Sequence, residues 1–273
     1  MTQRAETRNM ALFCDFENVA LGVRDAQYGQ FDIDKVIERL LLKGNIVVKK
    51  AYCDWARCKE CKAAMHEASF ELIEIPHVRQ SGKNSADIRM VVDALDLCYT
   101  KGHVDTFVII SGDSDFSPLV SKLRENNKTV IGVGVKNSTS DLLIANCDEF
   151  IYYDDLVRGQ TPRKKAGGRE GSPVPAKGVA AKAPVGAGDK KQEAWNLIVE
   201  TYEALVEERG EGEKIWGSMI KQTLKRRKPG FSESYYGFRS FGQMLEEAAA
   251  RGILELDRED KSGGFVIKRC HAS

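Results

Sequence analysis

Residues 106–123 read TFVIISGDSDFSPLVSKL, and this stretch decides the fold. Its first five residues, 106–110, form an apolar, largely β-branched run of the kind that makes a buried parallel strand. A short polar segment, 111–115, follows and carries two carboxylates separated by one residue. From Phe116 onward the spacing is helical, with Pro118 where the first turn of a helix tolerates proline. The stretch therefore predicts a strand, a tight turn with two acids, and a helix.

The same strand-then-helix pattern recurs on both sides of this stretch. The further predicted strands are 11–16, 46–52, 71–76, 129–135 and 149–153. The further predicted helices are 34–43, 57–69, 85–100 and 140–145. Strands alternating with helices predict an α/β fold with a three-layer, Rossmann-like parallel sheet. Ligands bind at the carboxyl ends of the strands in such sheets, and the turn at 111–115 lies there.

Composition narrows the class of protein. The 273 residues are enough for one substantial domain and a smaller one, and the formal net charge is only +1. We expect a cytoplasmic protein without a membrane partner, because no run of ~18 apolar residues occurs and the N-terminus lacks the apolar core of a signal peptide. The seven cysteines are scattered and odd in number, which predicts reduced thiols.

Charge is unevenly distributed along the chain. Residues 158–191 hold nine Lys or Arg against two acids, with no aromatic residue, and predict a flexible basic linker. This linker separates a domain at 8–157 from a smaller one at 192–270. In the smaller domain, helices at 192–208, 215–226 and 240–251 precede strands at 252–256 and 265–267. That order predicts a winged helix.

Four acids fall where a site is expected. Asp15 ends the first strand, Asp113 and Asp115 follow the fourth, and Asp87 lies in the first turn of the helix at 85–100. Clustered carboxylates repel one another, and a hard cation such as Mg²⁺ or Mn²⁺ removes that penalty. Each acid also has a structural interpretation: Asp115 as a helix cap, for example, or Asp87 as a favourable first-turn acid.

Three blocks of sequence resemble the NYN domain: DFENVA at 15–20, GKNSADIRMVVDAL at 82–95 and SGDSDFSPLV at 111–120. That family belongs with the PIN-like metal-dependent ribonucleases, and the resemblance covers residues 10–156. It implies Asp15, Asp87 and Asp113 as metal-binding acids with Asp115 as a fourth. It also implies a catalytic role for Asn18, whose amide would hold an acid or a substrate phosphate, and a role in phosphate binding for Ser111, the small polar residue before the third acid. Ser138 and Ser140 precede a short predicted helix, where their hydroxyls are candidates to receive a phosphate.

The stretch KPGFSESYYGFRSFGQMLEEA at 228–248 resembles an OST-HTH (LOTUS) domain, a family associated with RNA binding. The resemblance implies a basic RNA-binding surface. Its candidate residues are Lys221, Lys225, Arg226, Arg227, Lys228 and Arg239. Protein binding stays open as an alternative, because the domain carries thirteen bases and fourteen acids.

The leading hypothesis is a Mg²⁺- or Mn²⁺-dependent endoribonuclease with an RNA-binding C-terminal module. A catalytically silent regulator that binds RNA or recruits a protein is the alternative. A phosphatase with an aspartyl nucleophile fits less well, because D-x-D does not follow the first strand. Zinc at Cys53, Cys58, Cys61 and His66 is disfavoured, because these residues span the end of a strand and a predicted helix.

Overall fold

The computed structural model describes residues 8–75, 85–157, 187–210, 213–258 and 264–270. The chain divides into two compact units, which are described separately. Most of the predicted linker at 158–191 lies outside the described residues, and its last five positions belong to a helix. Within the described ranges, no helix combines the length and apolar character needed to cross a bilayer.

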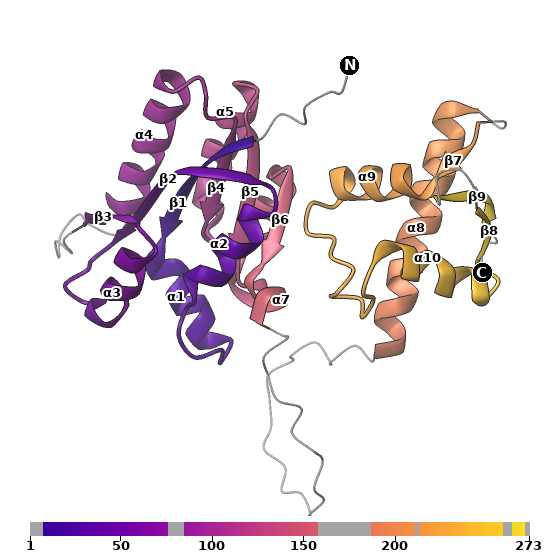
Figure 1. Cartoon of the computed structure of the whole chain (residues 1–273), viewed down its shortest axis with the longest axis horizontal. Coiled ribbons are helices and arrows are strands. Elements are labelled where there is room, and N and C mark those ends of the chain that lie inside the picture. Colours follow the sequence, from indigo (N-terminus) through magenta and orange to yellow (C-terminus); the bar gives the residue numbers. More distant parts are fainter. Residues whose placement is uncertain (1–7, 76–84, 158–186, 211–212, 259–263, 271–273) are drawn as a thin grey trace, which may run out of the picture. The chain divides into compact units, whose positions relative to one another are not determined.

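A six-stranded sheet forms the centre of the first unit (Figure 1). Its order is β3-β2-β1-β4-β5-β6, and every neighbouring pair is parallel. The strands are β1 (Arg8–Asp15), β2 (Gly44–Cys53), β3 (Glu71–Glu74), β4 (Thr106–Ile110), β5 (Thr129–Gly134) and β6 (Glu149–Tyr152). The predicted parallel α/β sheet is confirmed.

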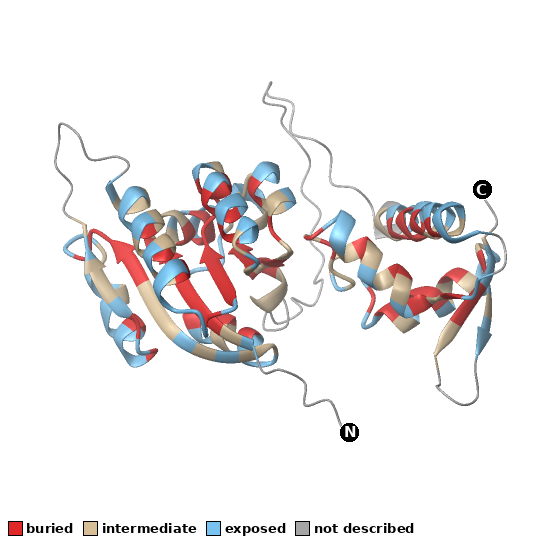
Figure 2. Cartoon of the chain, turned by 90° about the horizontal axis from the view of Figure 1, so that it is seen from above, coloured by how far each residue is buried: buried red, intermediate tan, exposed pale blue. Residues whose placement is uncertain are grey.

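Helices cover both faces of this sheet and bury the central strands (Figure 2). They are α1 (Phe16–Asp25), α2 (Ile33–Leu41), α3 (Lys59–Glu67), α4 (Ser85–Thr100), α5 (Ser117–Glu125), α6 (Asp141–Asn146) and α7 (Tyr153–Val157), with 3₁₀ turns η1 (Ser114–Phe116) and η2 (Lys136–Ser138). Alternate residues of β1 enter two separate cores: Leu12 packs with α1, α2, α3 and α7, and Phe13 packs with α4, α5 and α6. The three predicted layers follow from this alternation.

The strand order reverses between β1 and β4. The chain runs outward from β1 to β3 on one side and from β4 to β6 on the other. Cys14 lies opposite Ile110 in the register, so Asp15 and Ser111 leave the sheet side by side. The predicted juxtaposition of these two strand ends is confirmed, and such a switch point is where open α/β sheets bind ligands.

Three local predictions were wrong. Helix α1 begins directly after β1 and was not predicted, because its residues follow a strand end that reads as a turn. Asp34 opens the helix predicted at 34–43 and was expected to cap it, but the cap of α2 is Asp32, whose side chain accepts from the backbone N–H of Asp34. The spacing of the helix at 85–100 predicts one apolar side made of Ile88, Val91, Val92, Leu95 and Cys98. In α4 Cys98 is buried, but Ile88 and Val92 are 62% and 54% exposed.

The buried stripe of α4 is offset by two positions from Ile88 and Val92. Met90, Ala94 and Cys98 recur every four residues and are buried against the sheet. Ile88 and Val92 recur with the same spacing on a stripe that faces outward.

The second unit combines three helices with a small antiparallel sheet of order β7-β9-β8. Its elements are α8 (Ala187–Arg209), β7 (Ile215–Trp216), α9 (Gly217–Arg227), α10 (Phe241–Ala250), β8 (Leu254–Arg258) and β9 (Phe265–Cys270). Ile215 and Trp216 were predicted to be helical, but they pair with Ile267 and Val266 of β9. The helix therefore begins at Gly217, after the strand.

Candidate active site

Asp15 is the buried centre of the candidate site. It ends β1, caps the amino terminus of α1, and is only 7% exposed. Its Oδ1 accepts a hydrogen bond from the backbone N–H of Asn18 at 3.4 Å. Its Oδ2 accepts from the Ser111 hydroxyl at 3.0 Å. Both oxygens of the carboxylate are thus held in place by groups from α1 and from the end of β4.

A second set of bonds fixes the turn that follows β4. The Ser111 hydroxyl also accepts from the backbone N–H of Asp113 at 3.2 Å. The side-chain oxygen of Asn18 accepts from the backbone N–H of Gly112 at 2.9 Å. A Cβ at Gly112 would lie 2.5 Å from the backbone oxygen of Ser138, so this close approach requires glycine. The turn at 111–113 is therefore held between Asn18 of α1 and Ser138 of η2.

Asp113 caps η1. Its Oδ1 accepts from the backbone N–H of Asp115 at 3.0 Å. The interpretation of Asp115 as the cap is therefore wrong: α5 follows Phe116 with no side-chain cap, and Asp115 remains exposed. The extended backbone of Asp113 suits a cap, whereas Asp115 is already inside the 3₁₀ turn.

The acids perturb one another. The pKa of Asp15 is raised to about 7, mainly by burial and next by the nearby charge of Asp87, with a smaller contribution from Asp113. The hydrogen bonds from Ser111 and Asn18 act in the opposite direction. Burial also raises the pKa of Asp87, followed by the charges of Asp113, Asp115 and Glu17. The structure therefore brings the predicted acids into one electrostatic neighbourhood.

The donor chemistry of this neighbourhood fits a hard divalent cation. Its ligating atoms are carboxylate oxygens, and each oxygen of Asp15 keeps a second lone pair beside its hydrogen bond. In the part of the chain that the structure describes, however, no group of three or more His, Cys, Asp or Glu side chains is arranged to hold a metal ion. Binding a cation would require the acids to close around it, and the predicted metal ligands stay predictions.

The two serines predicted to receive phosphate have structural contacts. The Ser138 hydroxyl donates to the backbone oxygen of Val135 at 3.4 Å. Ser140 caps α6, and its hydroxyl accepts from the backbone N–H of Leu142 at 3.2 Å. Both lie near the Gly112 turn, because the backbone N–H of Ser140 donates to the Gly112 oxygen at 2.9 Å. Their role toward phosphate stays a prediction.

One feature of the site was missed. The bond between Asn18 and Gly112 joins positions far apart in sequence, and only the glycine between Ser111 and Asp113 hinted at a tight approach. The cysteines at 53, 58 and 61, which are all described, form no metal-binding group with His66. Burial raises the pKa of the Cys53 thiol, which opposes the thiolate that zinc requires.

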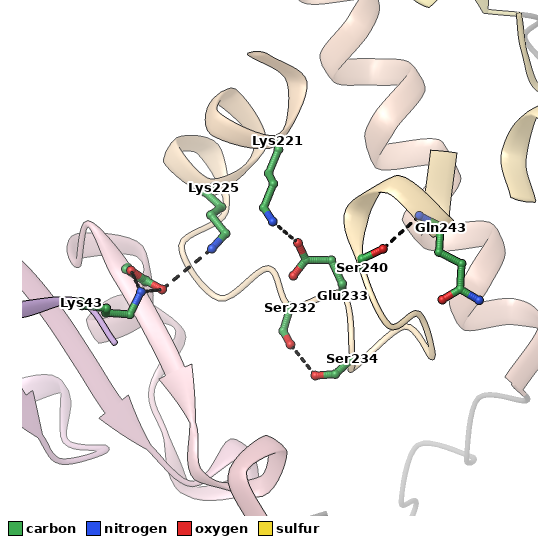
Figure 3. Close-up of polar contacts among 9 residues, drawn as sticks. Lys43, Lys221, Lys225, Ser232, Glu233, Ser234, Ser240 and Gln243 are labelled. Atoms are coloured by element: carbon green, nitrogen blue, oxygen red, sulfur yellow. Dashed lines mark hydrogen bonds and ion pairs between the residues drawn. The ribbon is translucent and has the colours of Figure 1, made fainter. Parts of the chain in front are cut away.

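The predicted basic residues of the C-terminal region lie at one end of α9 and before α10. Lys225, Arg226 and Arg227 form the last turn of α9, and residues 225–231 belong to the first compact unit. Lys225 is ion-paired with Glu149 at 3.9 Å, and Lys221 with Glu233 at 2.7 Å (Figure 3). Arg239 directly precedes Ser240, the cap of α10, whose hydroxyl accepts from the backbone N–H of Gln243 (Figure 3). The RNA-binding surface stays a prediction.

Known proteins are similar in sequence to part of this chain. An uncharacterized protein from Methanocaldococcus jannaschii is 30% identical over 137 residues, which are 49% of this chain and 54% of that protein. The meiosis regulator and mRNA stability factor 1 of Xenopus tropicalis is 24% identical over 154 residues, which are 56% of this chain and 9% of that protein. The chain thus spans about half the length of the archaeal relative and a small part of the frog protein.

A solved structure has the same fold. The crystal structure of a protein of unknown function from Vibrio parahaemolyticus matches 57% of this chain and 98% of its own length, with 27% identity and a TM-score of 0.50. The family model of the NYN domain matches residues 9–154, which contain the whole sheet and every acid of the candidate site. The chain therefore belongs to the NYN domain family.

Proposed function

We propose that the chain is a divalent-metal-dependent endoribonuclease that hydrolyses phosphodiester bonds of RNA. The observation that carries the proposal is the buried Asp15 carboxylate, held by Ser111 and Asn18 beside Asp87 and Asp113. Burying a carboxylate among other acids is costly unless a cation compensates. Membership of the NYN family supports the proposal, as does a relative whose name refers to mRNA stability.

The acids have distinct proposed roles. Asp15 and Asp113 hold Mg²⁺ or Mn²⁺, and Asp115 supports them from the edge of the site. A bound cation supplies charge neutralisation for the phosphate oxygens and for the leaving oxygen. Asp87 orients the attacking water and accepts its proton. The water oxygen forms a bond to phosphorus as the bond from phosphorus to the 3′ oxygen breaks in line.

Ser111 and Asn18 are positioning residues in this proposal. The Ser111 hydroxyl fixes one oxygen of Asp15, and the Asn18 backbone fixes the other. Their bonds also lower the pKa of Asp15 against the effect of burial, which favours the charged form that binds a cation. Preorganisation of this kind removes the cost of ordering the acids during the reaction.

For the C-terminal unit, we propose an OST-HTH-type winged helix that binds RNA. The order α8-β7-α9-α10-β8-β9 and the basic last turn of α9 support this assignment. Replacing Arg226 and Arg227 with Glu in the full chain is expected to weaken binding of single-stranded RNA, and to reduce its salt dependence. Unchanged RNA affinity in this variant would favour a protein partner for the unit.

Asp113→Asn tests the nuclease. Cleavage of labelled single-stranded RNA in Mn²⁺ is expected to fall roughly 100-fold or more. Asp96→Asn is the matched control, because Asp96 is an exposed acid of α4 outside the site. Wild-type activity in a folded Asp113→Asn protein would overturn the assignment.

Calorimetry separates the enzyme from a silent regulator. The nuclease proposal expects Mn²⁺ uptake that Asp113→Asn weakens, whereas a regulator with an inactive site takes up no Mn²⁺ through these carboxylates. Wild-type protein that neither binds Mn²⁺ nor cleaves RNA would favour the regulator.

A further inference from the structure

A surface pocket of about 460 Å³ lies directly beside the acids. It is lined by Ser114, Asp115, Ser117, Pro118, Ser121 and Leu142, which belong to η1, α5 and α6. Asp115 connects the pocket to the candidate site, because its backbone N–H donates to the Asp113 carboxylate. The volume falls within the ~300–1,000 Å³ of typical small-molecule sites.

Ser117 is the unusual residue of this pocket. It is only 6% exposed, and its hydroxyl has no hydrogen-bond partner in the described structure. A buried hydroxyl without a partner costs free energy, so such groups call for an explanation. The neighbouring Ser121 differs, because its hydroxyl donates to the side-chain oxygen of Asn146 at 3.4 Å. The oxygen itself is shielded from solvent, so a polar group in the pocket becomes its partner only after the Ser117 side chain rotates toward the pocket.

The residues that line the pocket indicate which kind of ligand fits it. Pro118 and Leu142 supply apolar surface, and Leu142 is 57% exposed although it is a large hydrophobic residue. Ser114, Ser117 and Asp115 supply hydroxyls and a carboxylate. A planar nucleobase satisfies both kinds of surface, because its face is apolar and its edge carries donors and acceptors.

A phosphate group fits this lining poorly. No Lys or Arg lines the pocket, and the Asp115 carboxylate would repel an anion. A ribose ring would leave the apolar surface of Leu142 largely uncovered. The lining therefore favours the base over the other two parts of a nucleotide.

We propose that this pocket binds the base of a nucleotide next to the phosphate that is cleaved in single-stranded RNA. The inference rests on the proposed function, since the acids beside the pocket are what would place a scissile phosphate there. The Ser117 hydroxyl, once its side chain has rotated, contacts the edge of the base, and Pro118 and Leu142 contact its face. Asp115 favours bases that present amino or imino hydrogens toward it.

The test requires no cleavage. The ¹⁵N-labelled full chain is titrated in EDTA with each of the four nucleoside 5′-monophosphates and, separately, with ribose 5-phosphate. The proposal expects amide shifts at Ser117, Leu119 and Leu142 with the nucleotides and none there with ribose 5-phosphate. Equal shifts with ribose 5-phosphate, or nucleotide shifts confined to other parts of the chain, would overturn it.

Three variants sharpen the result. Ser117→Ala is expected to weaken nucleotide binding about 2–10-fold. Leu142→Ala is expected to weaken it as well, and this variant changes an exposed residue that the fold does not need. Leu42→Ala is the control, because Leu42 is 78% exposed and lies outside the pocket. Unchanged affinity in both pocket variants counts against the proposal. Base-dependent shifts without any cleavage of RNA would keep the pocket and reject the nuclease.

Discussion

The Ser111 hydroxyl donates a hydrogen bond to Asp15 Oδ2 at 3.0 Å, although the two residues are 96 positions apart. The register between β1 and β4 places them at adjacent strand ends. Ser111 is fully buried and Asp15 nearly so, which means that water cannot replace this bond if it is removed. The order of the strands therefore brings Ser111 to Asp15, and the bond between them lowers the pKa of Asp15.

Replacing Ser111 with Ala tests this link. The change removes a bond that lowers the pKa of Asp15, so that pKa should rise above its present value of about 7. We expect a loss of about 1–3 kcal/mol in the free energy of unfolding, because a buried acceptor and the N–H of Asp113 each lose a partner. Urea denaturation measures the loss of stability, and Mn²⁺ affinity at neutral pH, which should fall, reports the rise in pKa.

Ser121→Ala is the matched control for Ser111→Ala. Ser121 is exposed and its hydroxyl makes one long bond, so its removal should change stability by less than about 0.5 kcal/mol. If Ser111→Ala is as stable as this control and binds Mn²⁺ equally well, the bond to Asp15 does not have the role inferred here.

Asn18 offers a pair of variants that separates geometry from charge. Asn18→Ala leaves the backbone N–H of Gly112 without its acceptor, and we expect a loss of about 1–2 kcal/mol in the free energy of unfolding. Asn18→Asp keeps an acceptor at the same place but adds a negative charge beside Asp15. It should be more stable than Asn18→Ala at pH 5 and lose that advantage toward pH 8. Urea denaturation at pH 5 and pH 8 distinguishes the two variants. Equal stability of both variants at both pH values would argue against a stabilising bond between Asn18 and Gly112.

The sheet could be predicted from sequence because its central strands are short apolar runs followed by polar turns. The run at 106–110 is buried in all five positions, and acids follow the strands that turn out to be neighbours. Parallel topology then fixes which ends meet, so Asp15 and Asp113 could be assigned to one edge before any coordinates.

The local errors have physical causes of their own. On α4 the branched residues Ile88 and Val92 fit the spacing of a core stripe, but the residues buried against the sheet are Met90 and Ala94, because apolar residues occur on more than one side of this helix. Asp113 and Asp115 are the same residue type, and either could cap a helix. The backbone angles of the turn make Asp113 the cap, and the sequence does not show those angles. The bond from Asn18 to Gly112 depends on the entry angle of α1, a helix that the sequence pattern did not reveal.

Gly112 predicts a sharp steric effect. Its missing Cβ would meet the backbone oxygen of Ser138 at 2.5 Å, and backbone cannot move aside as a flexible side chain can. Gly112→Ala should therefore displace the turn that carries Asp113, lowering the melting temperature and abolishing cleavage. Gly102→Ala is the control, since a Cβ there meets nothing within 4 Å. That variant should match or slightly exceed wild-type stability. Equal melting temperatures for the two variants would contradict the close approach.

The pKa of Asp15 predicts how the metal-free protein responds to pH. An Asp is ordinarily half-ionised near pH 3.8, whereas in the folded chain this occurs at about 7. Between these values the folded state binds more protons than the unfolded state, so stability falls as pH rises from about 4 to 7. The slope from this group approaches about 1.4 kcal/mol per pH unit. Asp15→Asn should remove that slope, whereas Asp96→Asn should keep it.

A divalent cation should reverse this dependence. Cation binding favours the ionised form of Asp15, so saturating Mn²⁺ should raise the melting temperature of the wild type far more at pH 8 than at pH 5. Asp15→Asn should lose most of this stabilisation, because the amide that replaces the carboxylate carries no charge for the cation to neutralise. Thermal melts with EDTA or Mn²⁺ at the two pH values measure the effect. If Mn²⁺ stabilises the wild type equally at both pH values, or still stabilises Asp15→Asn, the cation does not bind through the Asp15 carboxylate.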